Sequence, residues 1–292
     1  QLYGIPLDIH TTILYYNKDL LDMYGVAVPT NRAELLTAAK MMPNTDTGGW
    51  GLPLSTTWPS EYIYTTALYQ NGGVEINENS EPAYNSPAGL TALDMLSSII
   101  HEHKVSPLNV AVDGDLMMFN QGKAMFHING NWMLASVEEN AAAAGFNFGV
   151  TSLAKMFTDD PNTEHASKVH SRSHVFVIPD GRLKDDEKQA ALTFINYMTE
   201  NATLWAEAGG HVPANNTARE TAEYAELVHQ PNYGDVNDFQ LNPPSPYWYE
   251  AYSPVFSRVT TALSRADANY NDLLAAAVDE GKQLVAEAKS MV

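Results

Sequence analysis

Phe119–Trp132 reads Phe-Asn-Gln-Gly-Lys-Ala-Met-Phe-His-Ile-Asn-Gly-Asn-Trp, and this segment decides the fold class of the chain. Gln121-Gly122-Lys123 is typical of a helix end, because glycine readily adopts the left-handed conformation found there. Ala124–Ile128 is short, largely apolar and bounded by turn residues, which predicts a strand inside a layered sheet. Asn129-Gly130-Asn131 ends that strand and leaves Trp132 just beyond it, where open α/β sheets place their ligands. A role in the hydrophobic core is the alternative for Trp132, and this segment alone does not decide between the two.

Helical and strand patterns interleave along the rest of the chain, which predicts an α/β architecture with helices covering the sheets. Further strands are expected at Thr11–Tyr16, Phe148–Val150 and Val175–Ile178. Helices are expected over Asn17–Tyr24, after the cap Pro29-Thr30-Asn31, from Ser86 to Ile100, and over Asp185–Glu200 and Asp267–Lys289. The fourth of these helices is expected to bury Ala190, Ala191, Phe194, Ile195 and Met198. Two polar segments, 156–172 and 231–246, are interpreted as loops or connections between lobes.

The bulk composition describes a folded chain and excludes some classes of partner. Its 292 residues, of which 45% are hydrophobic, suit two domains better than one. Sixteen Lys plus Arg against 35 Asp plus Glu give a formal net charge of −19, which repels nucleic acid and anionic lipid. The absence of cysteine excludes thiol catalysis and cysteine metal sites. No apolar run reaches transmembrane length and no basic-then-apolar segment opens the chain, so we expect neither a membrane span nor a signal peptide.

Three of the five tryptophans fall at boundaries between predicted elements. Trp58 follows a strand at Gly51–Leu54, Trp132 follows the strand described above, and Trp248 precedes a helix within Ser245–Tyr249. Such rings suit sugar recognition, because the C–H face of a pyranose packs on an aromatic ring while its hydroxyls meet polar groups. Boundary aromatics also cap hydrophobic cores, so both roles stay open for each tryptophan.

Histidines and carboxylates supply further candidates. His10, His174 and His211 lie beside strands or a glycine loop, but their spacing matches no short metal motif such as His-Glu-x-x-His. We therefore expect them to hydrogen-bond ligand hydroxyls or backbone, and we expect no metal site. Asp8 and Glu250 lie near the aromatic clusters and could form the carboxylate pair of a glycoside hydrolase, although nothing in the sequence pairs them. The lack of a Gly-x-Ser-x-Gly elbow or a phosphate-binding loop favours binding over catalysis.

Several of these motifs follow one family pattern along nearly the whole chain. Gly4-Ile5-Pro6 with Leu14–Lys18 looks like a first strand crossing between two lobes. Phe119–Trp132 is similar to the signature Phe-x-x-Gly-Lys-Ala-x-Met-x-Ile-x-Gly-x-Trp, with a small departure within its strand, and Gly209–Ala214 looks like a glycine-proline loop of the same pattern. The chain thus resembles the family 1 extracellular solute-binding proteins of carbohydrate ABC transporters, the group that contains the maltodextrin-binding and glycerol-phosphate-binding proteins.

The resemblance implies a two-lobe periplasmic-binding-protein-like fold of the class II type, which closes by a hinge on a saccharide. In maltodextrin-like members, the tryptophans at the positions of Trp132 and Trp248 stack on sugar, and we expect Trp58 to be a third aromatic contact. The polar contacts are expected from Asp8, His10, Asn129, Gly209, Gly210 and His211. A neutral oligosaccharide is preferred over a phosphorylated one, because basic residues are scarce near the proposed site.

Compared with the family, this chain starts at the first crossing strand, so we expect the N-terminal part of the first lobe to be missing. Residues 1–7 and 151–226 are then the remainder of the first lobe, and residues 8–150 and 227–292 form the second lobe. The resemblance implies a monomeric carrier without cofactor, which is not an enzyme and delivers its sugar to the permease subunits of an ABC importer. Its expected place is the outer face of the membrane, with a lipid anchor, or the periplasm. A glycoside hydrolase using Asp8 and Glu250 is the alternative function.

Overall fold

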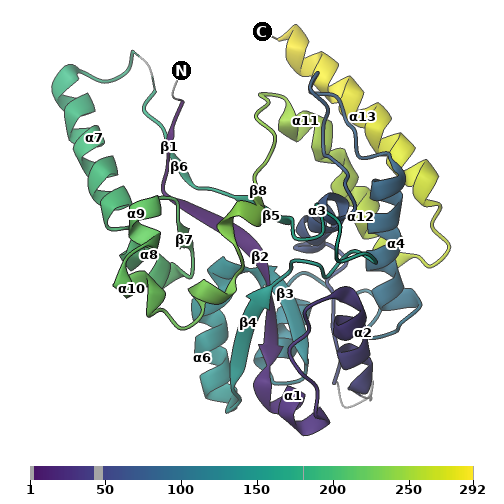
Figure 1. Cartoon of the computed structure of the whole chain (residues 1–292). Coiled ribbons are helices and arrows are strands. Elements are labelled where there is room, and N and C mark those ends of the chain that lie inside the picture. Colours follow the sequence, from purple (N-terminus) through teal and green to yellow (C-terminus); the bar gives the residue numbers. More distant parts are fainter. Residues whose placement is uncertain (1–2, 43–48, 180, 292) are drawn as a thin grey trace.

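A computed structural model describes residues 3–42, 49–179 and 181–291, and it confirms the α/β fold class (Figure 1). The long strand β2 (Asp8–Asn17) is the centre of the larger sheet. Its second half pairs antiparallel with β3 (Phe126–Gly130) and β4 (Phe148–Ser152), and its first half with β5 (Val169–Arg172) and β7 (Val212–Pro213). One strand therefore connects both ends of the molecule.

The other elements surround this strand. β8 (Phe239–Gln240) runs parallel to β5, while β1 (Ile5–Pro6) and β6 (Val175–Phe176) form a separate antiparallel pair. The α-helices are α1 (Lys18–Tyr24), α2 (Arg32–Met41), α3 (Ser60–Gln70), α4 (Pro87–His101), α5 (Gly114–Asn120), α6 (Leu134–Ala144), α7 (Asp185–Glu200), α8 (Ala202–Gly209), α9 (Asn216–Arg219), α10 (Ala222–Ala225), α11 (Trp248–Tyr252), α12 (Pro254–Ser264) and α13 (Tyr270–Ser290). Short 3-10 helices span Asn131–Met133, Gln230–Asn232 and Val236–Asp238.

Both faces of β2 are covered, because its side chains alternate between two cores. Leu14 belongs to the main core, which is completed by α3, α4, α12 and α13. Its neighbours Ile13 and Tyr15 face a second core with residues of α5, α6 and α8. These three side chains are fully buried, so the helices cover the sheet as the interleaved pattern predicts.

The segment that predicts the fold adopts nearly the expected structure. Gly122 follows α5 with a φ of 68°, which is the left-handed conformation expected at that helix end. The strand starts at Phe126 and continues to Gly130, slightly later than predicted, because Asn129 and Gly130 still pair with β2. Trp132 lies in the 3-10 turn immediately beyond, so its place just after a strand end is confirmed.

Helix starts follow the sequence where a capping residue is present. Asn17, Asn31 and Ser86 each accept a backbone N–H from the first turn of α1, α2 and α4. Helix α3 is absent from the predicted elements. Ten of its eleven residues are buried, so it lacks the polar face that gives a surface helix its period.

The burial predicted for α7 is wrong, although the helix has the predicted bounds. Of the five residues expected to be buried, only Ile195 is, with 5% of its surface exposed, whereas Phe194 is 56% exposed. The spacing of apolar residues identifies the apolar face of a helix but does not show whether another element covers it. Within the described residues, α7 lies at the end of a thin arm, where little packs against it (Figure 1).

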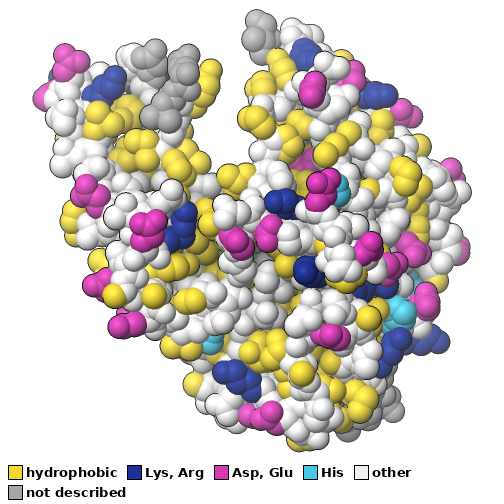
Figure 2. All heavy atoms as spheres, in the orientation of Figure 1, with side chains coloured by type: hydrophobic (Ala, Val, Ile, Leu, Met, Phe, Trp, Pro, Cys, Tyr) yellow, Lys and Arg dark blue, Asp and Glu magenta, His cyan; other side chains and the backbone are white. Residues whose placement is uncertain are grey.

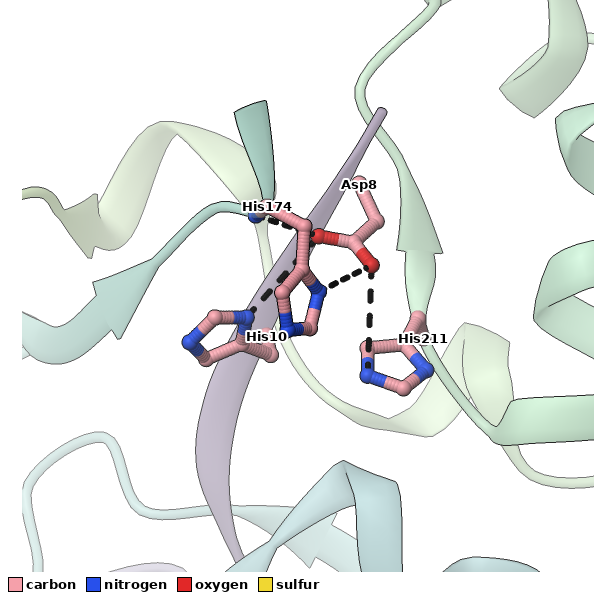
Figure 3. Close-up of side chains that lie close together, drawn as sticks. All are labelled: Asp8, His10, His174 and His211. Atoms are coloured by element: carbon pink, nitrogen blue, oxygen red, sulfur yellow. Dashed lines mark hydrogen bonds and ion pairs between the residues drawn. The ribbon is translucent and has the colours of Figure 1, made fainter. Parts of the chain in front are cut away.

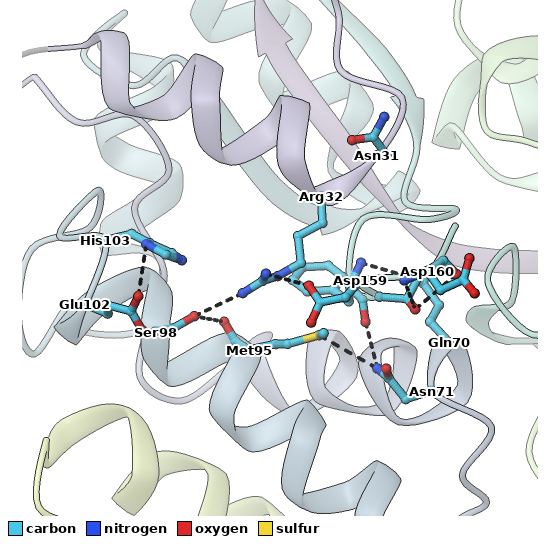
Figure 4. A network of polar contacts seen from close by, with 12 residues as sticks. Asn31, Arg32, Gln70, Asn71, Met95, Ser98, Glu102, His103, Asp159 and Asp160 are labelled. Atoms are coloured by element: carbon cyan, nitrogen blue, oxygen red, sulfur yellow. Dashed lines mark hydrogen bonds and ion pairs between the residues drawn. The ribbon is translucent and has the colours of Figure 1, made fainter. Parts of the chain in front are cut away.

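The segment between β4 and β5 packs against the helices of the main core. Gln70 of α3 accepts a hydrogen bond from the Phe157 backbone N–H at 2.7 Å and donates to the Leu153 carbonyl at 2.8 Å. Arg32 at the start of α2 donates to Asp159 at 2.9 Å (Figure 4). Leu153 and Phe157 are themselves members of the main core. This connection is therefore an integral part of the larger unit.

An arm and a body divide the molecule (Figure 1). The arm carries β1, β6, β7 and helices α7–α10, and the body carries the other elements, with β2 running from one to the other. Figure 2 shows a wide hollow between α7 of the arm and α11 and α13 of the body, with hydrophobic side chains on both sides. No helix in the described ranges combines the length and the apolar character needed to cross a bilayer.

Candidate ligand-binding site

Trp58 and Trp132 lie together, although 74 positions separate them in the sequence. Their ring centroids are 6.2 Å apart and their planes are inclined by 33°. Tyr62, in the first turn of α3, contacts both rings, with its centroid 4.5 Å from Trp58 and 6.4 Å from Trp132. Both indoles are only partly buried, so part of each ring remains available to a ligand.

Arg172 at the end of β5 joins Trp248 to this group. Its guanidinium lies 4.5 Å from the centroid of Tyr62 and 4.8 Å from that of Trp248, and its Nη1 donates to the Tyr62 hydroxyl at 2.6 Å. Cation–π contacts of this kind hold a guanidinium between two rings. We call Trp58, Tyr62, Trp132, Arg172 and Trp248 the aromatic wall.

Glu75, a buried residue outside the aromatic wall, fixes the orientation of Trp248. Its carboxylate is fully buried and accepts a hydrogen bond from Trp248 Nε1. Burial raises the pKa of Glu75 to about 7, although the hydrogen bond from Trp248, the neighbouring Tyr69 hydroxyl and the charge of Arg172 oppose that rise. The indole of Trp248 is thereby held in place by a group that is half protonated near neutral pH.

Asp8, His10, His174 and His211 form a second group, which we call the Asp8 cluster (Figure 3). His174 donates to Asp8 twice, through its backbone N–H at 2.9 Å and its ring Nδ1 at 2.8 Å. His10 Nδ1 and His211 Nε2 lie 3.8 and 3.9 Å from the same carboxylate. One ligand atom from each of the four residues lies within 4.8 Å of the other three, so the cluster has the dimensions of a metal site.

The Asp8 carboxylate is charged and accepts three hydrogen bonds, two from His174 and one from Trp205. Burial by itself would raise the pKa of Asp8, but its contacts with His10, His174 and Trp205 outweigh that effect and hold the pKa well below its usual value. Trp205 contributes an indole N–H donated to Oδ2 at 2.7 Å. Burial also lowers the pKa of His211, against the opposing charge of Asp8. At neutral pH, His211 is therefore neutral and Asp8 is an anion.

The cluster and the wall are neighbours. The ring of His10 meets Trp132 edge-on, with 5.5 Å between centroids. Together they present flat apolar faces beside a set of hydrogen-bonding groups, which is the composition that a sugar requires. The polar partners of Asp8 are residues other than Glu250, and a carboxylate kept ionised by its hydrogen bonds is a poor general acid. The geometry thus gives no support to the hydrolase alternative.

The remaining predicted site residues shape the backbone under these groups. Gly210 ends α8 with a φ of 74°, and a Cβ there would lie 2.3 Å from the carbonyl oxygen of Asn131. A Cβ on Gly209 would lie 2.9 Å from His211 Nδ1. Asn129 is 1% exposed, and its side chain accepts a hydrogen bond from the backbone N–H of Gly130. The contacts described for these three residues are with backbone and with His211, and their contact with a ligand remains a prediction.

Local signals in the sequence do not identify Tyr62, Glu75, Trp205 or Arg172 as site residues, whereas His174 is among the three histidines expected to hydrogen-bond ligand hydroxyls or backbone. Tyr62 follows Trp58 at helical spacing, which is the one local signal that could have linked them. Glu75 and Trp205 lie far along the chain from the groups that they contact, Trp248 and Asp8. Only the folded chain brings these residues together.

Comparison with known proteins gives consistent matches. Residues 1–232 match the family model described as bacterial extracellular solute-binding protein. The maltodextrin-binding protein MdxE of Bacillus subtilis is 26% identical, with 84% of this chain and 57% of the relative covered. A maltooligosaccharide ABC transporter solute-binding lipoprotein of Streptococcus pneumoniae is 24% identical, with 76% of this chain and 51% of the relative covered. The chain spans about half the length of the curated relatives it matches.

Solved structures agree on the fold. MalE3 of T. maritima with maltose bound superposes with a TM-score of 0.78 at 22% identity, covering 97% of this chain and 72% of that one. UgpB of Mycobacterium tuberculosis in complex with glycerophosphocholine gives a TM-score of 0.76 at 16% identity, covering 98% and 71%. Because the family match extends over most of the sequence and the fold agrees, the chain belongs to the bacterial extracellular solute-binding proteins.

Proposed function

We propose that this protein captures a neutral oligosaccharide outside the cell and delivers it to the permease subunits of an ABC importer. The aromatic wall is the observation that carries this proposal, because it presents several partly buried rings beside the hydrogen-bonding groups of the Asp8 cluster. An oligosaccharide needs several flat apolar faces for successive rings together with a few fixed polar partners. A carrier also needs no acid–base pair, in keeping with an Asp8 carboxylate that its hydrogen bonds keep ionised.

The proposed roles follow from the position of each residue. Trp132, Trp58 and Trp248 stack on sugar rings, and His10 is the member of the Asp8 cluster that lies closest to them, against Trp132. His211 and Asp8 are more than nine-tenths buried, so they act mainly by holding neighbouring groups. The polar contacts expected from Asn129 and from the Gly209–Gly210 backbone remain predictions.

The choice of a neutral sugar rests on charge. Within the described part of the wall and cluster, Arg172 is the one Lys or Arg, and it is already engaged by two aromatic rings and the Tyr62 hydroxyl. A phosphorylated ligand normally requires additional positive charge or a helix N-terminus. Maltodextrins are the first candidates to test, since curated relatives from Bacillus and Streptococcus are named for binding them or related maltooligosaccharides.

Closure of the arm on the body is the proposed capture step (Figure 1). The arm then corresponds to the first lobe and the body to the second lobe. The packing of Leu153, Phe157 and Val169 in the main core supports assigning residues 151–172 to the second lobe, instead of to the remainder of the first lobe. We further propose that the carrier works as a monomer, either lipid-anchored on the extracellular face of the membrane or free in the periplasm.

Isothermal titration calorimetry of the 292-residue chain against a panel of sugars tests this function. The panel contains maltotriose, maltose, glucose and glycerol-3-phosphate, and the sugar is recovered afterwards and checked for cleavage. We expect saturable binding of one neutral oligosaccharide, which is recovered intact, and weaker or no binding of the phosphorylated ligand. Cleavage of the sugar that disappears in Asp8→Asn or Glu250→Gln variants would overturn the carrier assignment in favour of a hydrolase.

A further inference from the structure

We propose that the Asp8 cluster binds a divalent transition-metal ion, with Zn²⁺ as the best-matched ion (Figure 3). Three imidazole nitrogens and one carboxylate oxygen lie within 4.8 Å of one another. Zn²⁺ favours four nitrogen and oxygen ligands in a tetrahedral arrangement, whereas Mg²⁺ and Ca²⁺ favour oxygen ligands alone. This proposal goes beyond saccharide capture and does not rest on it.

The fold assembles the four ligands from three separate parts of the chain. Asp8 and His10 are two residues apart on β2, so their side chains leave the same face of the strand. His174 follows β5, and His211 lies between α8 and β7. No short sequence motif is therefore expected for such a site, which explains why the histidine spacing predicts none.

Neighbouring groups orient the ligands before any metal binds. The backbone N–H of His174 donates to Asp8 Oδ1 at 2.9 Å, and Trp205 Nε1 donates to Asp8 Oδ2 at 2.7 Å. The Trp205 ring also stacks on the ring of His211, with 5.3 Å between centroids and 27° between planes. Donors and stacking contacts of this kind, one step removed from the metal, fix ligand orientation in protein metal sites.

Two of the histidines face the carboxylate without reaching it. The His211 side chain is 8% exposed, and its Nε2 lies 3.9 Å from Asp8 Oδ2, beyond hydrogen-bond distance. His10 Nδ1 is buried, has no hydrogen-bond partner among the described residues, and lies 3.8 Å from Asp8 Oδ1. Zinc–nitrogen bonds of about 2.0–2.1 Å place tetrahedral ligands roughly 3.3 Å apart. To close the cluster around an ion, the contacts of His10 and His211 with Asp8 would have to shorten by about half an ångström, and the widest pair of ligand atoms, which lie within 4.8 Å of each other, by up to about 1.5 Å.

A bound ion would tie together the segments that pass between the arm and the body. β2 would supply two ligands, Asp8 and His10, while His174 between β5 and β6 and His211 before β7 would supply one each. His10 would remain against Trp132 at the edge of the aromatic wall. The alternative is a network of hydrogen bonds alone, in which the same residues position one another without a metal.

Titration of the chelator-treated chain with ZnCl₂ in a calorimeter distinguishes these two roles. We expect one Zn²⁺ per chain, and at least about 10-fold weaker binding in His174→Ala and in His211→Ala. His165→Ala is the matched control, because His165 is a surface histidine that also faces a carboxylate, with 3.3 Å between its Nε2 and Glu164 Oε1. We expect the control to bind Zn²⁺ as the parent chain does, and we expect no binding of MgCl₂.

Absence of saturable binding near one equivalent overturns the proposal, and so does equal affinity in His174→Ala and the His165→Ala control. His174 is 57% exposed, so its replacement tests the site even if the buried His211 variant fails to fold. Titration of the same samples with maltotriose separates this result from the proposed function. Sugar binding without zinc binding refutes the metal site alone, and zinc binding without binding of any sugar in the panel refutes saccharide capture alone.

Discussion

Replacing Glu75 with Gln is expected to make the stability of the protein less sensitive to pH. The Glu75 carboxylate is fully buried and accepts a hydrogen bond from Trp248. Burial raises its pKa from 4.5 to about 7. Gln has nearly the same shape and still accepts the Trp248 hydrogen bond through its carbonyl oxygen, but it cannot ionise.

The size and sign of the effect follow from that pKa. In the unfolded chain Glu75 loses its proton near pH 4.5, whereas in the folded chain it keeps the proton until about pH 7. Between these values the folded state binds more protons, so the free energy of unfolding falls as pH rises. The two pKa values lie about 2.5 pH units apart, which corresponds to about 3 kcal/mol. The stabilisation that comes from the proton on Glu75 is fully present below about pH 4.5 and is completely lost above about pH 7.

Urea unfolding of the parent chain and Glu75→Gln at pH 5, 7 and 9 measures this difference. From pH 5 to pH 9, we expect the free energy of unfolding of the parent to fall by about 3 kcal/mol more than that of the variant. Glu81→Gln is the control, because Glu81 is an exposed carboxylate in the same loop region. The same dependence of unfolding free energy on pH in the parent and Glu75→Gln, or a larger change in Glu81→Gln, would contradict a raised pKa of Glu75.

Three further tests, with four substitutions in all, address the packing around the site and on α7. Gly210→Ala is expected to lower the free energy of unfolding in urea by at least about 1–2 kcal/mol. Its backbone is left-handed, and a Cβ would lie 2.3 Å from the carbonyl oxygen of Asn131. Unchanged stability would contradict this expectation. Gln70→Leu is expected to cost about 3 kcal/mol by the same assay, since it removes hydrogen bonds to three backbone groups of the β4–β5 connection, the Phe157 N–H and the Leu153 and Lys168 carbonyls. A cost below about 1 kcal/mol would show that other contacts hold the connection. On α7, Ile195→Ala is expected to lower the free energy of unfolding by about 2 kcal/mol, because Ile195 is buried, and Phe194→Ala by less than about 0.5 kcal/mol, because Phe194 is exposed. Equal losses in thermal unfolding would contradict this difference in burial.

Local sequence patterns predict the parts of the fold that depend on interactions between residues close together in the chain. The apolar run after Gln121-Gly122-Lys123 is buried as a strand, and the turn that follows places Trp132 just beyond the strand end. Helix caps such as Asn17 and Ser86 act on the backbone within three residues, so they too can be recognised in the sequence. Helix α3 cannot be recognised in this way, because a helix that is buried on nearly all sides lacks the regular alternation of apolar and polar residues.

The candidate site depends on contacts that no local pattern contains. Arg172 reaches Tyr62 and Trp248 only because β5 pairs with β2 and ends beside α3. The Asp8 cluster likewise forms where β2, β5 and β7 converge. The sequence identifies tryptophans and histidines with suitable chemistry, whereas their mutual distances are set by the register of the sheet.

The affinity of tryptophan variants for an oligosaccharide tests most directly whether the aromatic wall binds sugar. Trp132→Ala and Trp248→Ala are compared with Trp50→Ala, which changes a tryptophan that lies beside Ile100 and Leu108, away from the wall. With maltotriose, or the tightest ligand of the panel, we expect each wall variant to lose about 2 kcal/mol, roughly 30-fold in Kd, and the control to bind like the parent. Unchanged affinity in both wall variants, with the parent chain binding the sugar, would contradict the assignment of the site.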